Sequence, residues 1–160
     1  MSSTTCFLLI NFLGNLSYYI DNNCLIESAT KALHTSLQSN NIPSDGTVLH
    51  IASGAFMHSD LTDIVIPECI KSIGANAFSY CKQLTEIIIP EGCKIEATAF
   101  GWCENLVSVT LPSDIEDITT YVFTSCNIKT LTIPKNVTSI RDSAFSKNKN
   151  LHTLICMDDI

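Results

Sequence analysis

The sequence predicts an α/β repeat protein whose coils stack into a solenoid, with a parallel β-sheet on the concave side and an irregular or short-helical convex side. Three observations predict this fold. Phenylalanine recurs at a nearly constant spacing, proline recurs at the same spacing, and a strand-like apolar pattern precedes each proline. The residues before the repeats are expected to form an N-terminal cap, because a solenoid exposes apolar surface at its ends.

Two residue types set the period of the repeat. Phenylalanines separated by 22, 22, 23 and 22 residues are Phe56, Phe78, Phe100, Phe123 and Phe145. Prolines separated by 23, 22 and 22 residues are Pro67, Pro90, Pro112 and Pro134. The full units defined by these marks are residues 61–83, 84–105, 106–127 and 128–150, with a partial unit at 43–60 and a half unit at 151–160. Residues 43–160 are therefore predicted to form the solenoid.

Each full unit opens with the pattern L-x-x-I-x-I, whose period of two is typical of a strand. The predicted inward residues are Leu61, Ile64, Ile66, Leu84, Ile87, Ile89, Leu106, Val109, Leu111, Ile128, Leu131 and Ile133. Proline then ends the strand, because it has no N–H for a parallel ladder. A second inward pair follows in each unit: Ile70 and Ile73, Cys93 and Ile95, Ile115 and Ile118, Val137 and Ile140. Stacked units would share these residues in one continuous core.

The segment A-F-x-x-C closes each unit, and we expect it to form a short helical or 3₁₀ turn that places the phenylalanines in one buried column. Cysteines three residues after the phenylalanine are Cys81, Cys103 and Cys126. A buried thiol there is a small apolar group with a weak donor for a backbone carbonyl, and Asn148 offers stronger donors at the same place. Units two and three each lack one residue, between Pro90 and Ile95 and after Cys126, both in linking stretches.

Residues 1–42 are the predicted N-terminal cap. Apolar runs at 7–12 and 16–20 flank Leu-Gly-Asn, which predicts a hairpin. A helix is predicted over residues 23–39, with Asn22 or Asn23 as its N-cap. Its apolar positions at helical spacing are Leu25, Ala29, Ala32, Leu33 and Leu37. No cap is evident at the other end, so we expect this edge to contact another chain or a second copy.

Composition and charge exclude several classes of protein. The chain is 46% hydrophobic and 16% charged, which excludes a disordered chain. Its net charge of −7 and single arginine, Arg141, argue against nucleic-acid binding, because neutralising phosphates requires clustered Lys and Arg. No apolar run is long enough for a transmembrane helix. Residues 6–13 are apolar but lack the flanks of a signal peptide, which favours a cytoplasmic location over the alternative of the cell surface.

The unit L-x-x-I-x-I-P-x-x-V-x-x-I-x-x-x-A-F-x-x-C resembles the BspA-type leucine-rich repeat from Ile51 to Cys156, most clearly at Leu61–Pro67 and Ala77–Cys81. The resemblance implies a curved leucine-rich-repeat solenoid. It also implies an interaction function, since members in bacteria and protists look like surface adhesins or protein-binding modules. The family carries no catalytic residues that could be transferred to this sequence.

A candidate binding face follows from the strand pattern, because side chains alternate between core and solvent. The predicted partner-binding residues are Asp63, Val65, Glu86, Ile88, Ser108, Thr110, Thr130, Thr132, Thr153 and Ile155. The alternative is an ordinary solvated strand face. Tyr80 and Trp102 are either exposed anchors for a partner or packed partly against neighbouring coils.

The sequence gives little support for catalysis, a metal or a cofactor. The histidines His34, His50, His58 and His152 lack zinc-site spacing, there is no C-x-x-C pair, and no phosphate-binding glycine motif occurs. Outside the cysteine column, the obvious candidates for a nucleophile are Cys6, Cys24 and Cys69. We therefore predict a non-catalytic scaffold that binds a partner protein. A structural subunit stacking through its C-terminal end is the alternative, as is an adhesin if the chain is secreted.

Overall fold

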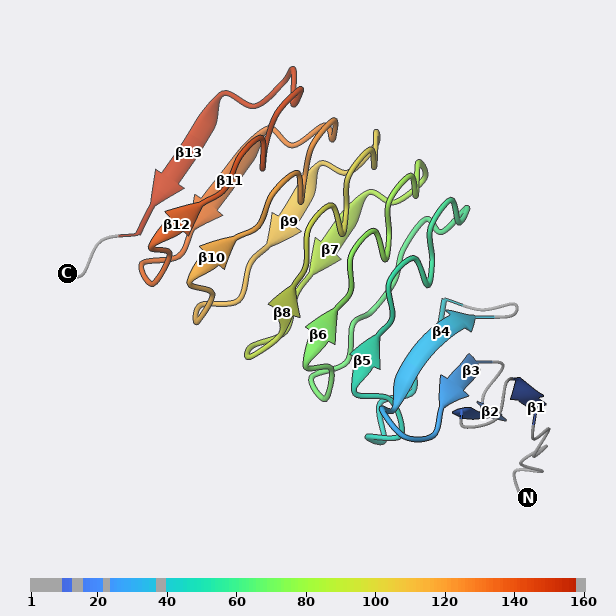
Figure 1. The fold of residues 1–160 in the computed structure, drawn as a ribbon. Coiled ribbons are helices and arrows are strands. Elements are labelled where there is room, and N and C mark those ends of the chain that lie inside the picture. The colour runs from blue at the N-terminus through green and yellow to red at the C-terminus, as the bar shows by residue number, and fades with distance from the viewer. Residues whose placement is uncertain (1–9, 13–15, 22–23, 37–39, 158–160) are drawn as a thin grey trace.

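The computed structural model describes residues 10–12, 16–21, 24–36 and 40–157. Stacked coils form a β-solenoid in which each coil contributes to two rows of short strands (Figure 1). The first row, from the L-x-x-I-x-I segments, contains β7 (Glu86–Ile88), β9 (Ser108–Thr110), β11 (Thr130–Ile133) and β13 (Thr153–Cys156). The second row contains β5 (His50–Ile51), β6 (Ser72–Ile73), β8 (Lys94–Ile95), β10 (Asp117–Ile118) and β12 (Ser139–Ile140).

Both rows are parallel. In the first row β7 pairs with β9 and β11 pairs with β13, as expected for strands from successive units. The second row was not expected from the sequence, and it extends from β5 through β6 to β8 and again from β10 to β12. The predicted strand of the first full unit is reduced to one bridge between Val65 and Asn41. Here the Asp63 carbonyl oxygen accepts a hydrogen bond from the side-chain amide of Asn40 at 3.3 Å, where a strand partner would offer a backbone N–H.

The A-F-x-x-C segments form hydrogen-bonded turns, and the expected short helix is absent from the described part of the chain. The N–H of Ala77 donates to Gly74 O within its own turn at 3.1 Å, whereas the next N–H, of Phe78, donates to Ala99 O of the following coil at 2.8 Å. Residues with positive φ, such as Tyr80 at 62°, turn alternate peptide groups toward the following coil. A helix would keep every N–H inside its own coil, so the coil-to-coil bonds replace it.

The predicted phenylalanine column is confirmed. Neighbouring rings from Phe56 to Phe145 have centroids 5.0, 5.2, 5.5 and 6.0 Å apart and are inclined by at most 11°. The predicted role of the thiols is also confirmed. Each donates to the carbonyl oxygen of the phenylalanine in the preceding coil, at 3.0 Å for Cys81, 3.1 Å for Cys103 and 3.3 Å for Cys126.

Asn148 continues the thiol column. It also supplies a hydrogen-bond acceptor that is missing at the shortened linker after Cys126. Its amide donates to Phe123 O at 2.7 Å, as the thiols do in the other coils, and to Phe145 O at 2.9 Å. In the units with a complete linker, the N–H that opens the next strand donates to the residue of the thiol column, as Leu106 does to Cys103 O at 2.9 Å. Ile128 follows the deletion, and its N–H donates instead to Asn148 Oδ1 at 3.2 Å.

The deletion in the second unit interrupts the second row, because β8 and β10 share no ladder. This unit is one residue short after Pro90, so its turn is shorter than the turn of the next coil. Side chains bridge the two turns. The N–H of Ser113 donates to Glu91 Oε1 at 2.9 Å, and the N–H of Gly92 donates to Asp114 Oδ1 at 3.1 Å.

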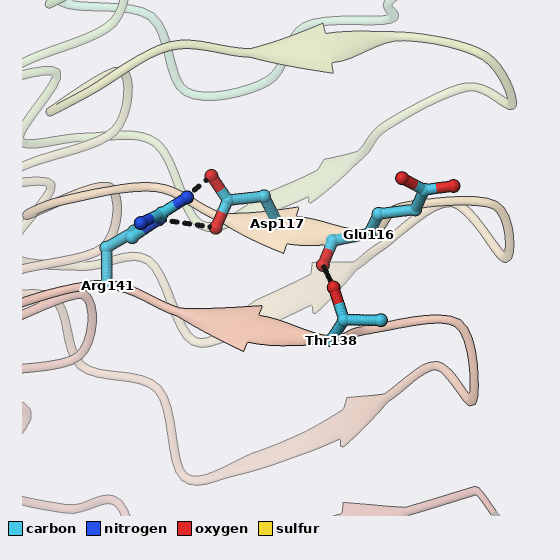
Figure 2. A network of polar contacts seen from close by, with 4 residues as sticks. All are labelled: Glu116, Asp117, Thr138 and Arg141. Atoms are coloured by element: carbon cyan, nitrogen blue, oxygen red, sulfur yellow. Dashed lines mark hydrogen bonds and ion pairs between the residues drawn. The ribbon is translucent and has the colours of Figure 1, made fainter.

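Side chains reinforce the ladder between β10 and β12 (Figure 2). Arg141 Nε donates to both carboxylate oxygens of Asp117 at 2.9 and 3.2 Å, and Thr138 Oγ1 donates to Glu116 O at 3.2 Å. The hydrogen bond from Arg141 holds the pKa of Asp117 below its usual value. Because both side chains are largely exposed, the pair contributes little to stability.

The N-terminal segment is an antiparallel meander of four strands in its described residues. Its strands are β1 (Ile10–Phe12), β2 (Leu16–Asp21), β3 (Cys24–Glu27) and β4 (Ala32–Ser36). The β1–β2 pair is antiparallel, where the sequence predicted a hairpin. The predicted helix over 23–39 is wrong, because β3 and β4 occupy it; Asn22, Asn23 and Leu37 lie outside the described residues. β4 pairs in parallel with β5, so it satisfies a sheet edge that a helix would leave open.

The core occupies the space between the two strand rows and contains most of the predicted inward residues. Leu61, Val109, Ile115 and Val137 are only partly buried. Ile140 was predicted to point inward, but it is 50% exposed. It belongs to the last full coil, over which the described chain adds only strand β13, so no second-row strand covers it. The division into a cap (1–42) and a solenoid (43–160) remains a proposal.

The dual role of Asn148 leads to a prediction. Replacing it with cysteine keeps a donor for Phe123 O but removes the acceptor for the buried N–H of Ile128. Leaving such a group unpaired costs about 1–3 kcal/mol, so Asn148→Cys should lower the free energy of unfolding by that amount in urea denaturation. Inserting one residue between Asn127 and Ile128 in the same variant should recover most of the loss. An unchanged midpoint for Asn148→Cys alone would contradict this role.

Candidate functional site

The ten predicted partner-binding residues lie on the outer side of the first strand row. The register stacks Glu86 beside Ser108 and Ile88 beside Thr110. It likewise stacks Thr130 beside Thr153 and Thr132 beside Ile155. Nine of the ten side chains are exposed, and Thr153 is half-buried. The structure thus places them in two adjacent columns along one face.

Two apolar side chains stand out on this face. Val65 is 77% exposed and Ile88 is 64% exposed, the two highest values among the large hydrophobic residues of the described chain. They occupy equivalent places in successive coils. Acidic residues flank them at Asp63 and Glu86, and Asp63 also accepts a hydrogen bond from Asn40 Nδ2 at 2.8 Å. The face is therefore a shallow apolar spot with acidic neighbours, and it suits contact with another surface.

Burial makes the thiols of the column poor nucleophiles. Desolvation raises the pKa of Cys81 to about 11 and that of Cys126 to about 12, and it raises the pKa of Cys103 further. Burial likewise raises the pKa of Cys93 to about 11. A thiol with such a pKa is protonated at neutral pH and reacts slowly. The structure records free thiols at Cys69, Cys81, Cys93, Cys103, Cys126 and Cys156.

Among the described residues, the other chemical candidates do not form a catalytic arrangement. Cys24 is buried, and Cys69 is half-buried with its thiol near Val48 O at 3.6 Å. Cys6 lies outside the described residues. His50 Nδ1 lies 2.8 Å from Ser72 Oγ, and His34 Nε2 lies 3.6 Å from Glu27 Oε2. A search of the described ranges finds no group of three potential metal ligands and no helix that could span a membrane.

The hollows of the surface are shallow and of mixed charge. One of about 900 Å³ extends along the second strand row past Lys94, Asp117 and Arg141. A more enclosed one of about 450 Å³ lies at the interrupted ladder between β8 and β10, beside Ile115 and Thr119. Neither combines an apolar enclosure with convergent polar groups, as small-molecule sites usually do.

A second aromatic column, which was not predicted from the sequence, lies outside the phenylalanine column. The rings of His58 and Tyr80 stack with centroids 4.6 Å apart, and those of Tyr80 and Trp102 stack 4.9 Å apart with an angle of 3°. Of the two alternatives for Tyr80 and Trp102, packing against neighbouring coils is the one observed, and both side chains keep partial exposure. The signal was present, because all three residues stand two positions after a core phenylalanine.

The C-terminal part of the chain matches a known repeat family. Residues 93–160 match the family described as "BspA type Leucine rich repeat region (6 copies)". Among solved structures, the T. pallidum leucine-rich repeat protein TpLRR is 25% identical, with a TM-score of 0.71 over 87% of this chain and 67% of that one. No curated protein matches.

Two further structures share the fold. The pneumococcal vaccine antigen PcpA is 19% identical, with a TM-score of 0.64, and the match covers 97% of this chain and 51% of PcpA. A leucine-rich repeat protein from Bacteroides ovatus is 22% identical, with a TM-score of 0.55, over 90% of this chain and 52% of that one. The present chain thus spans about half the length of these two proteins.

The buried thiols lead to a prediction about reactivity. At pH 8 a thiol with a pKa of about 11 is ionised in only about one molecule in a thousand. Alkylation of the folded protein should therefore label the exposed Cys156 rapidly and leave Cys81, Cys103 and Cys126 unlabelled until urea is added. Peptide mass spectrometry at successive times measures each site. Labelling of Cys103 in the folded protein at the rate of Cys156 would contradict the buried column.

Proposed function

We propose that this chain, which carries BspA-type leucine-rich repeats, is a non-catalytic scaffold that binds a partner protein through the outer face of its first strand row. Repeat solenoids of this kind offer an extended surface for recognition. The finer assignment is the set of ten residues in two columns, with Val65 and Ile88 as its apolar centre.

The observation that carries this proposal is the exposure of Val65 and Ile88 at equivalent places in successive coils. Burying an apolar side chain of this size against a partner contributes about 1.5–3 kcal/mol. Apolar anchors inside a polar rim are the usual arrangement of an interface centre. The neighbouring Asp63 and Glu86, on a chain of net charge −7, favour a partner with a basic surface.

The test is a double substitution on this face. Val65→Lys with Ile88→Lys should abolish capture of the partner, because two charges would enter the apolar centre. A matched control, Met57→Lys with Tyr121→Lys, makes the same change at exposed apolar residues of the turns. Pull-down from the native source with quantitative mass spectrometry compares both variants with the unaltered chain.

The outcome is read only from variants that fold. Circular dichroism and urea denaturation should give all three proteins the same midpoint within error, because the substituted side chains are exposed. Partners that are lost with the first variant and kept with the control support the face. Equal capture by both variants would rule out this site.

A second candidate function is a structural subunit that stacks through its last coil. The supporting observation is a group of exposed apolar residues there, about half-exposed in each case: Ile140, Leu154, Ile155 and Met157. Strand β13 also has one edge without a neighbour in the described chain. A further coil, from another chain or a second copy, would cover these groups.

Light scattering distinguishes self-association from the scaffold alone. If the last coil pairs with a second copy, the mass should double at high protein concentration, and Leu154→Lys should abolish the doubling because it places a charge in the contact. A monomer at all concentrations contradicts self-association. The adhesin alternative requires secretion, and labelling intact cells with an antibody against this chain tests it directly.

A further inference from the structure

The outer aromatic column stops in the middle of the solenoid. His58, Tyr80 and Trp102 occupy the same place in successive coils, whereas the next two coils have Ser125 and Lys147 there. All five residues have positive φ, between 55° and 62°, so the backbone holds this place in the same conformation whichever side chain it carries. Ser125 is too small to continue the stack from Trp102.

Backbone bonds fix the alignment of this column. The N–H of Trp102 donates to Thr124 O at 2.8 Å, and the N–H of Ser125 donates to Ser146 O at 2.8 Å. Tyr80 stacks against one face of the indole. The other face therefore points along the column toward Ser125, where no ring follows.

A hollow lies at this place, with a volume of about 750 Å³. Its walls include Trp102 on one side, Lys147 on the other and Ser125 between them. Two coil spacings of about 4.8 Å separate the places of Trp102 and Lys147, which gives a slot of about 10 Å. A ring in van der Waals contact with the indole would occupy the place that an aromatic side chain at position 125 would otherwise take.

We propose that this slot binds the pyranose ring of an acidic carbohydrate, stacked on the free face of Trp102. The C–H groups on one face of a sugar ring carry small positive charges, and the π face of an indole is negative. Lys147 and Lys149 line the slot and would pair with a carboxylate on the sugar. Glu104 also lines it, but its charge is balanced by Lys82 at 3.0 Å.

The polar groups around the slot favour a sugar over an aromatic side chain or a nucleic-acid base. Asn150 Nδ2 donates to Asn127 Oδ1 at 2.6 Å, and both amides line the slot, where they can bond to ring hydroxyls. A phenylalanine side chain would offer these amides no hydrogen bonds and a tyrosine would offer a single hydroxyl, whereas a pyranose carries several hydroxyls. A nucleic acid would be repelled by a chain with net charge −7. The site goes beyond the proposed scaffold function, because it lies on the turns and not on the strand face.

The sequence provides its own probe, because Trp102 is the single tryptophan of the chain. Titration of the full chain with sodium glucuronate should change the indole fluorescence in a saturable way. Glucose differs from glucuronate by lacking the carboxylate, and it should bind about tenfold more weakly or worse, at matched ionic strength. Lys147→Gln should remove most of this preference.

Two substitutions at one position provide the decisive comparison. Ser125→Tyr should extend the stack and fill the slot, as Tyr80 does one place before Trp102, and should lower glucuronate affinity by about tenfold or more. Ser125→Asn is the matched control, because asparagine tolerates positive φ and leaves the slot open, so its affinity should be unchanged. Both variants keep Trp102 as the reporter.

Four results would overturn the proposal. One is the absence of a saturable response to glucuronate in the unaltered chain. Another is equal affinity for glucose and glucuronate, and a third is equal binding by Ser125→Tyr and Ser125→Asn. Stronger binding of AMP than of glucuronate would also overturn it, in favour of a nucleotide site. The urea midpoints of the variants, measured alongside, identify any loss caused by unfolding.

Discussion

The structure depends on one constraint: each coil must satisfy the backbone groups of its neighbour. In the turns, alternate N–H groups donate to the next coil and the remaining ones donate within the turn. This alternation requires positive φ at two places in each turn, which side chains other than glycine adopt at a cost. Thr98, with φ of 63°, adopts this conformation although its β-branched side chain makes it strained. The coil-to-coil bonds offset this cost, and they forbid a helix.

The same constraint made much of the fold predictable from the sequence. Because the coils stack in register, residues at the same place in successive units contact one another, and a period in the sequence becomes a column in space. The phenylalanine and thiol columns follow directly from the spacing. The chemistry of a buried thiol predicted that Cys81, Cys103 and Cys126 would donate to backbone carbonyls, and the structure shows that these belong to the preceding coil. The alternation of the strands likewise predicted which residues face outward.

The errors have physical causes. The helix predicted over residues 23–39 rested on apolar positions that fit a helical spacing, but Cys24, Ile26 and Leu33 are the residues fully buried there, and they fit two short strands. Local spacing could not reveal that the edge of β5 needs a strand beside it. The second strand row was missed because its strands are two residues long, too short to form a pattern. The outer aromatic column was not predicted because His58, Tyr80 and Trp102 are three different residue types, so no single residue recurs with the period of the units.

The irregular units show how far such a structure tolerates change. After Cys126 the linker is one residue short, and Asn148 supplies the acceptor that the backbone no longer offers. After Pro90 the shortened turn is bridged by Glu91 and Asp114. In both places a side chain in an adjacent coil replaces one backbone interaction, and the stack continues beyond it.

Inner and outer columns differ in how freely their residues can change from coil to coil. A core residue such as Phe100 stacks on a copy in each neighbouring coil, so a change there disturbs two contacts. An outer residue faces solvent on at least one side and is free to differ from coil to coil. Along the strand face Val65 and Ile88 give way to Thr110, and along the turns Trp102 gives way to Ser125. The outer surface therefore presents a new side chain about every 4.8 Å along the stack, while the core beneath it keeps the same residues. Both proposed binding sites lie on this variable surface.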